Sequence, residues 1–190
     1  MAEAVQEYRG AIDKGLEGVV ACTTKISSII DVTLTYRGYI IEDLAENATF
    51  EEVTFLLWND RLPNKSELQK LRADLGANMT LHPELIEVLK KLPSKGVHPM
   101  AWLRSAVSAM GLWDTEAQDN SEAANKAKAI KLTAQMGSLV AAFERIRTGQ
   151  QVVAPKADKS LAWNFMYMLT GNEPNNDFVK IFDVCLILHA

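Results

Sequence analysis

Apolar and polar residues alternate with the period of an α-helix over most of this chain. Residues 50–58 read FEEVTFLLW, and residues 65–79 repeat the same spacing after a short break at Arg61-Leu62-Pro63. Apolar side chains three and four positions apart share one face of a helix, so we predict an amphipathic helix over each stretch. The apolar residues are Phe50, Val53, Leu56 and Leu57 in the first stretch and Leu68, Leu71, Leu75 and Met79 in the second.

Two capping boxes mark where these helices begin. In such a box a short polar side chain caps the backbone N–H three residues on, and a glutamate returns to the N–H of the capping residue. The pairs are Thr49 with Glu52 and Asn64 with Glu67. We therefore expect the two helices to begin directly after Thr49 and Asn64.

Two His-Pro pairs, His82-Pro83 and His98-Pro99, indicate further helix starts. Proline suits the first helical turn because the N–H that it lacks has no partner there. We predict helices over residues 83–91 and 99–113. His82 and His98 are accordingly interpreted as helix-start residues, in preference to catalytic groups.

The longest predicted helix runs over residues 121–147. Acidic and amide residues precede it, Arg145 and Arg147 lie near its end and Gly149 follows, as the helix dipole and C-cap rules expect. Its small residues would allow another helix to approach closely, and the expected use of that face is an interface. They are Ala134, Gly137, Ser138, Ala141 and Ala142.

Two further helices complete the helical pattern, one over residues 159–169 that stops at Gly171 and one that begins near Asn176. The last helix is apolar and is still running at Ala190, with no glycine or asparagine cap after it. We expect this chain to be the first part of a longer one. A buried terminal helix is the alternative.

Only the first forty residues lack the helical period. VVACTTKISSIID and LTYRGYII are rich in β-branched, small and aromatic residues, which favours one or two short strands, as in a small hairpin. Strands and helices do not alternate along the chain, so a βαβ unit is not expected. The predicted fold class is therefore all-α, mainly helical, with one or two short N-terminal strands.

Composition narrows the class of protein further. The formal net charge of −4 argues against a nucleic acid as the main partner. No apolar stretch approaches the length that spans a bilayer, and the charged first fifteen residues do not resemble a secretory signal, so no membrane association is expected. Two cysteines, Cys22 and Cys185, do not make a disulfide framework and favour a cytoplasmic location.

Catalytic signatures are scarce in the sequence. It contains no Gly-rich phosphate loop, no HExxH, no CxxC and no GxSxG, and the cysteines lack metal-ligand spacing to a histidine. No metal site is predicted. His189 is placed deep in the last apolar helix, where an imidazole either is held by hydrogen bonds in the core or lines a buried site. The four tryptophans, Trp58, Trp102, Trp113 and Trp163, are interpreted as core or interface residues.

Four stretches of the sequence resemble the citrate synthase family. They are GLEGVVACTTKISSIID from Gly15, LTYRGYIIEDLAENATFEEVTFLLWNDRLP from Leu34, HPMAWLRSAVSAMG from His98, and the last stretch, from FMYMLTGNEP through FDVCLILHA. The early position of GLEGV resembles the shorter, dimeric Gram-positive and archaeal type. The resemblance implies a mainly helical fold, with residues 1–190 as the N-terminal part of the large domain.

The resemblance also implies a reaction. Citrate synthases condense acetyl-CoA with oxaloacetate to give citrate and free CoA in the tricarboxylic acid cycle, using two histidines and an aspartate and no cofactor, since acetyl-CoA is a substrate. We expect these three catalytic residues, the CoA site, the small domain and the rest of the large domain to lie beyond Ala190. His189, in LILHA, is the only residue expected beside the oxaloacetate site, in a supporting role, and the chain alone is expected to be inactive.

The resemblance further implies a homodimer that forms through residues 99–113 and 121–147. Two alternatives stay open. The chain could belong to a 2-methylcitrate synthase, which uses propionyl-CoA and shares these motifs, or it could be a non-catalytic helical oligomerisation module.

Overall fold

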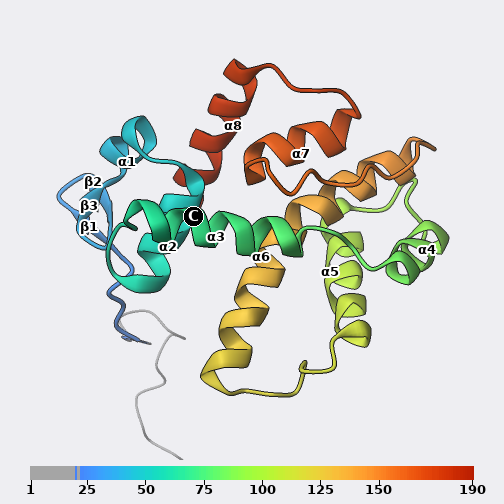
Figure 1. Ribbon diagram of the computed structural model, residues 1–190, viewed down its shortest axis with the longest axis horizontal. Coiled ribbons are helices and arrows are strands. Elements are labelled where there is room, and N and C mark those ends of the chain that lie inside the picture. The colour runs from blue at the N-terminus through green and yellow to red at the C-terminus, as the bar shows by residue number, and fades with distance from the viewer. Residues whose placement is uncertain (1–19, 21) are drawn as a thin grey trace, which may run out of the picture.

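One long helix, α6, runs through the middle of the computed structural model, and other helices pack around it (Figure 1). The structure describes residue 20 and residues 22–190, so the expectations for residues 1–15 and for GLEGV lie outside the described residues. The helices confirm the predicted fold class. The elements are β1 Ser27–Ile30, β2 Thr33–Tyr36, β3 Tyr39–Ile40, α1 Ile41–Asn47, α2 Phe50–Asn59, α3 Lys65–Asn78, α4 Pro83–Lys91, α5 Pro99–Met110, the 3₁₀ helix η1 Gly111–Trp113, α6 Glu122–Arg147, α7 Leu161–Thr170 and α8 Asn176–Leu188.

The N-terminal strands form a three-stranded antiparallel sheet in the order β1-β2-β3, where one or two strands were predicted. Ser27 of β1 is opposite Tyr36 of β2, and Tyr36 is opposite Tyr39 of β3. Arg37 and Gly38 both have positive φ, as the two central residues of a type I′ hairpin turn do, so the chain reverses at once into β3. Of the stretch 19–25, the described residues are not strand, and Val19 and Ala21 are not described.

The helix α1 follows β3 without a break and was not predicted. Its seven residues are too few to show a helical period, and no side chain caps its start. Glu42 and Asp43 in its first turn complement the positive end of the helix dipole. Ile41 and Leu44 are buried, so tertiary packing also holds this short helix in place.

The predicted helix starts are confirmed at the level of hydrogen bonds. The backbone N–H groups of Thr49 and Asn64 each donate to the returning glutamate over 2.8 Å. The Nδ1 atoms of His82 and His98 accept from backbone N–H groups two residues on, at 3.3 and 3.2 Å. Both imidazoles are therefore capping groups. The predicted helix over 99–113 ends differently, because its last three residues tighten into η1.

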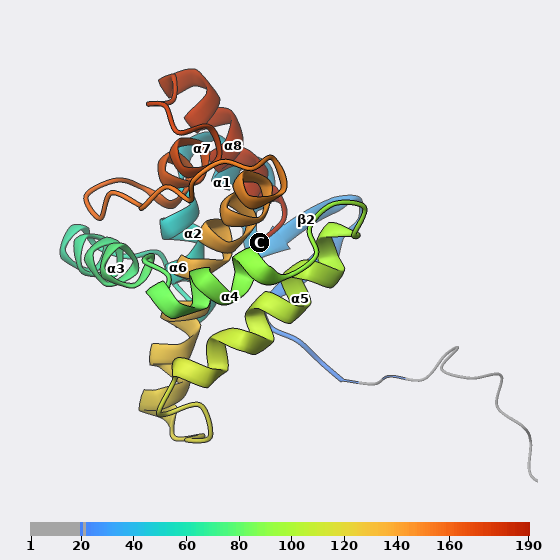
Figure 2. The ribbon, with the colours of Figure 1, turned by 90° about the vertical axis from the view of Figure 1, so that its right-hand side faces the viewer.

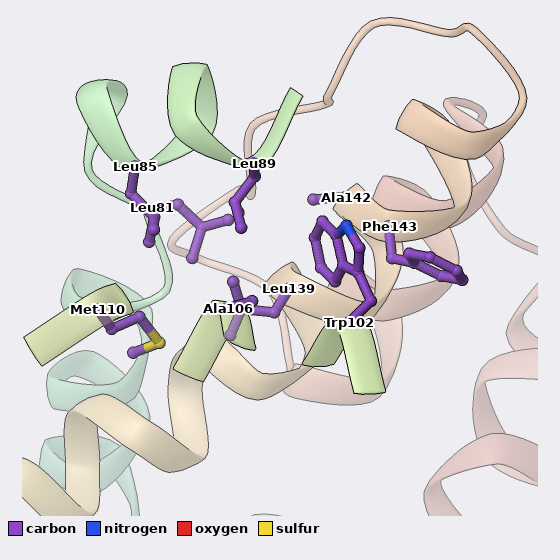
Figure 3. Close-up of a cluster of buried hydrophobic side chains, with 9 residues drawn as sticks. All are labelled: Leu81, Leu85, Leu89, Trp102, Ala106, Met110, Leu139, Ala142 and Phe143. Carbon is purple, nitrogen blue, oxygen red and sulfur yellow. The ribbon is translucent and has the colours of Figure 1, made fainter. Parts of the chain in front are cut away.

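The largest buried cluster joins α4, α5 and α6 (Figure 3). Trp102 of α5 and Phe143 of α6 contact each other in this cluster, with ring centroids 5.0 Å apart. Two smaller clusters hold the sheet, α1, α2 and α8 together and join α3 to α6. The residues labelled in Figure 3 are Leu81, Leu85, Leu89, Trp102, Ala106, Met110, Leu139, Ala142 and Phe143.

Four of the five small residues of α6 pack inside the chain and are not available to an intermolecular face, which corrects one prediction. Ala134, Ser138, Ala141 and Ala142 are buried within the chain, because α3, α5 and α7 approach α6 on that side. The hydroxyl of Ser138 donates to the carbonyl of Met79 over 2.8 Å, and the Gln135 amide donates to Thr80 over 2.9 Å. Trp102 and Met110 lie in the range 99–113 expected at the dimer interface, and both are buried in the same core.

The loop between α6 and α7 is held by one buried amide. Asn164 Oδ1 accepts from the backbone N–H of Lys156 over 2.7 Å, and its Nδ2 donates to the carbonyls of Lys156 and Lys159 at 2.9 and 3.1 Å. This clamp presses the loop against α3. A Cβ at Gly76 of α3 would lie only 2.2 Å from the carbonyl oxygen of Ala157.

We predict that Gly76→Ala destabilises the protein. The added methyl group meets backbone, which cannot rotate away, so the loss is expected to be about 1–3 kcal/mol, the usual range for overpacking. Chemical denaturation of the two proteins measures it. Gly111→Ala is the matched control, since a Cβ at Gly111 meets nothing within 4 Å. Equal stability of Gly76→Ala and the wild-type chain would contradict this close approach.

Candidate functional site

A polar cleft of about 570 Å³ lies where α2, α3 and α8 meet the loop before α7. Its walls carry the carboxylates of Glu51 and Asp183 and the cationic side chains of Arg72, Lys159 and Lys180. The two carboxylates are buried, whereas Arg72 is partly exposed. Burying a carboxylate is costly unless hydrogen bonds and opposite charges compensate for the lost water, so the partners of these two groups decide what the cleft does.

Glu51, in the first turn of α2, holds the start of another helix. Its Oε1 accepts from the backbone N–H of Leu161, the first residue of α7, over 2.9 Å. Its Oε2 has no hydrogen-bond partner, and the nearest cation is Arg72 of α3, whose Nη2 is 3.8 Å away. The first N–H groups of a helix lack partners within the helix, so this carboxylate caps α7 from outside.

Asp183 of α8 likewise caps the start of another helix, α2. Its Oδ1 accepts from the backbone N–H of Phe50, the first residue of α2, over 3.3 Å. Burial raises the pKa of the Asp183 carboxyl, and the nearby Glu51 carboxylate adds to the rise, against the hydrogen bond from Phe50. Together the two carboxylates tie α2 to α7 and α8, which lie side by side at one end of the molecule (Figures 1 and 2).

His189 lies at the end of α8, and the structure corrects its expected surroundings. We expected the ring deep within the apolar helix, but the helix ends at Leu188, and His189 is an exposed C-terminal cap. Ile187 is the buried residue of that turn. The Nδ1 of His189 lies 2.7 Å from the carbonyl oxygen of Cys185. A carbonyl accepts only, so Nδ1 carries the proton and the neutral ring keeps Nε2 as a free acceptor.

No acid–base pair involving a histidine is present among the residues that the structure describes. His82 and His98 accept hydrogen bonds from backbone N–H groups, and His189 is bonded to a backbone carbonyl. The described residues also contain no group of three or more His, Cys, Asp or Glu side chains that could hold a metal ion. Cys22 and Cys185 are exposed and unpaired. None of the described helices is both long and apolar enough to cross a bilayer.

The sequence predicts Glu51 as a solvated acid at a helix start; its place in the first turn of α2 agrees, but its burial corrects the solvated part, and the sequence predicts no role for Asp183. Their partners lie 110 and 133 residues away along the chain, so no local pattern could pair them. The one signal was Asp183 itself, a charged residue within an otherwise apolar run, IFDVCLIL. It indicates a buried polar contact without indicating the partner.

We predict that Asp183→Asn stabilises the protein above the pKa of Asp183 and flattens part of its pH profile. A carboxyl whose pKa is raised in the folded state favours folding most when protonated, so its contribution is lost as pH rises through that pKa. The Asn side chain keeps an acceptor for Phe50 and never ionises. Denaturant titrations between pH 4 and pH 8 measure the profile.

Two further variants complete this test. Asp183→Ala leaves the N–H of Phe50 without its partner and should be about 1–3 kcal/mol less stable than Asp183→Asn at every pH, because neither variant ionises at this position. Asp158→Asn, at the exposed rim of the same cleft, should keep the wild-type profile. Parallel pH profiles for Asp183→Asn and the wild-type chain would show that Asp183 is not the titrating group.

Comparisons with known proteins agree on one family. Residues 15–190 match the family described as "Citrate synthase, C-terminal domain". The chain is 52% identical over 177 residues to citrate synthase 2 of Bacillus subtilis and 43% identical over 181 residues to the citrate synthase of Deinococcus radiodurans. It is 38% identical to the 2-methylcitrate synthase of Mycobacterium tuberculosis. These matches cover 93%, 94% and 100% of this chain and 48% of each relative.

Solved structures show the same relationship in three dimensions. The citrate synthase of Pyrobaculum aerophilum superposes with a TM-score of 0.88 at 38% identity, over 98% of this chain and 49% of that chain. A ternary complex of citrate synthase from Thermoplasma acidophilum with carboxymethyl coenzyme A and oxaloacetate superposes with a TM-score of 0.86 at 25% identity, over 94% of this chain and 47% of that one. The chain therefore belongs to the citrate synthase family, and it spans about half the length of the relatives that it matches.

Proposed function

We propose that this chain supplies one part of a citrate synthase that condenses acetyl-CoA with oxaloacetate to give citrate and CoA. The observation that carries the proposal is the 52% identity to a citrate synthase over nearly the whole described fold. Identity to the 2-methylcitrate synthase is lower, at 38%, which favours acetyl-CoA over propionyl-CoA. The part is the N-terminal half of the enzyme in this proposal, and the enzyme acts in the cytoplasm.

In this proposal His189 stands beside the oxaloacetate site as a supporting residue. Two features support that position. The hydrogen bond to Cys185 fixes the tautomer of the ring, and the exposed Nε2 is free to accept from a neighbouring group. The carboxylates of Glu51 and Asp183 support the site indirectly, because they hold α7 and α8 against α2.

The chemistry needs more than these residues. Forming the enol of acetyl-CoA requires a base at its methyl group and a donor at its carbonyl oxygen, and the oxaloacetate carbonyl requires a second donor. The proposal assigns the two catalytic histidines and the aspartate to the remainder of the enzyme, and it needs no cofactor besides the substrates. No described residue is assigned a catalytic role.

We further propose that the enzyme is a homodimer formed through the solvent-facing sides of residues 99–113 and 121–147. Met100 and Leu112 support this surface, because both are large apolar side chains exposed on α5 and η1. Trp102 and Met110 face the opposite way, into the core, and take no part in the contact.

The dimer proposal predicts that Met100→Glu gives a monomer in sedimentation velocity where the wild-type chain gives a dimer at micromolar concentration. Glutamate is favourable in the first turn of a helix, so the variant should stay folded. Phe178→Glu is the matched control, because Phe178 is 60% exposed in the first turn of α8 and Met100 is 63% exposed in the first turn of α5. A wild-type chain that sediments only as a monomer would disprove the proposal.

A second prediction concerns activity. The purified chain, mixed with acetyl-CoA and oxaloacetate, should release no CoA above background in a coupled thiol assay. Each missing acid–base group typically contributes a factor of about 10²–10⁴ to the rate. The loss of several such groups therefore lowers the rate of CoA release below what the assay detects. Turnover within tenfold of a full-length citrate synthase would mean that the chain carries its own catalytic residues.

Complementation tests the proposed reaction. The chain is mixed with the half of Bacillus subtilis citrate synthase 2 that it does not match, expressed as a separate polypeptide. Release of CoA with acetyl-CoA supports the proposal, and faster release with propionyl-CoA supports a 2-methylcitrate synthase instead. A stable complex with neither activity would favour the oligomerisation module.

A further inference from the structure

One carboxylate oxygen in the polar cleft is buried and has no hydrogen-bond partner. It is Oε2 of Glu51, on a side chain that is only 2% exposed. The capping of α7 does not explain it, because the N–H of Leu161 is bound by the other oxygen, Oε1. An unpaired buried acceptor is costly and rare in folded proteins. The cleft therefore holds an acceptor that a ligand could satisfy.

Arg72 stands beside this oxygen and is held there loosely. Its Nη2 is 3.8 Å from Oε2 of Glu51, beyond hydrogen-bonding distance. The same nitrogen donates to the hydroxyl of Thr49 over 3.3 Å, which is a long hydrogen bond. The side chain of Arg72 is 44% exposed at the mouth of the cleft. The guanidinium can therefore turn toward a ligand at the cost of one weak hydrogen bond.

The charged side chains of the cleft are ordered by depth. The acids Glu51 and Asp183 are buried, whereas the bases Arg72, Lys159 and Lys180 are exposed. A simple cation would have to pass the bases at the mouth, and a simple anion would meet the acids inside. A ligand that carries both signs of charge complements both layers.

Aliphatic side chains form the rest of the wall. Leu161 and Val179 are partly exposed in the cleft, and Leu75 and Met79 are buried. Binding sites for small molecules combine such an apolar lining with a few placed polar groups, and a volume of about 570 Å³ is within their usual size. The ligand that fits this wall has an aliphatic part beside its charged groups.

We propose that the polar cleft binds an aliphatic α-amino acid. Its ammonium group donates to Oε2 of Glu51, and its carboxylate accepts from Arg72. Its side chain lies against Leu161 and Val179. The two charges of an α-amino acid are attached to one carbon, so they match the adjoining charges of Glu51 and Arg72. Arg72 turns outward as the ligand enters, and one long ion pair is exchanged for two contacts with the ligand.

Titration calorimetry on the chain, with L-leucine as the probe, tests the proposal. Saturable binding of one molecule per chain is the expected result. Isocaproate has the same carbon skeleton without the ammonium group, and isoamylamine has it without the carboxylate. Each should bind about tenfold more weakly than L-leucine or worse, because each leaves one of the two charged partners unsatisfied.

Two variants test the residues assigned to the site. Glu51→Gln keeps an oxygen for the N–H of Leu161 but removes the charge, and Arg72→Gln removes the cation. Each should weaken L-leucine binding about tenfold or more. The matched controls are Glu42→Gln, an exposed acid in the first turn of α1, and Lys70→Gln, an exposed base on the same helix as Arg72. Both controls should bind L-leucine as the wild-type chain does.

Each outcome decides the proposal. Binding that the two site variants weaken and the two controls leave unchanged upholds it. A wild-type chain that does not bind L-leucine overturns it, as does binding that Arg72→Gln leaves unchanged. Since Arg72 is exposed, its replacement leaves the fold intact, so this variant decides the matter even if Glu51→Gln unfolds. Isoamylamine or isocaproate that binds as tightly as L-leucine also overturns the proposal, because the cleft would then accept a simple ion.

Discussion

The close approach of α3 and α7 to α6 is the constraint on which the rest of the structure depends. It is possible because α6 presents alanine and serine on that side, and it places Ser138 and Gln135 within hydrogen-bonding distance of the chain leaving α3. The position of α7 in turn determines where the preceding loop crosses Gly76 of α3. It also places the first N–H groups of α7 beside Glu51, which caps them. One face of α6 therefore fixes both the core and the cleft, whereas Leu132, Met136 and Val140 of the same helix are exposed.

Local signals predicted the helices well and their burial poorly. Thr49 with Glu52, Asn64 with Glu67, and the two His-Pro pairs each act within four residues, so the sequence alone identifies them. The small residues of α6 were correctly recognised as a close-packing face, but the sequence cannot say whether the neighbour is another helix of the same chain. The helix α1 was missed because seven residues hold less than two full turns of pattern.

The candidate site was harder to predict from the sequence than the helices were, because its contacts join residues that are far apart along the chain. His189 was identified through its resemblance to a family motif, and in the structure its ring is exposed at the C-terminal cap of α8. Glu51 and Asp183 were missed because each acts on a helix far away in sequence. Charges inside apolar runs are visible in a sequence, but the helix ends that they serve are set by tertiary packing.

The Asn164 clamp has a consequence for how the molecule opens. The loop before α7 has no regular secondary structure, and a single side chain at the first turn of α7 supplies the hydrogen bonds that hold Lys156 and Lys159. These backbone groups can be freed only when α7 itself moves. The amide hydrogen of Lys156 should therefore exchange with solvent in step with those of α7, so that one position in an irregular segment is as slow to exchange as the helix that follows it.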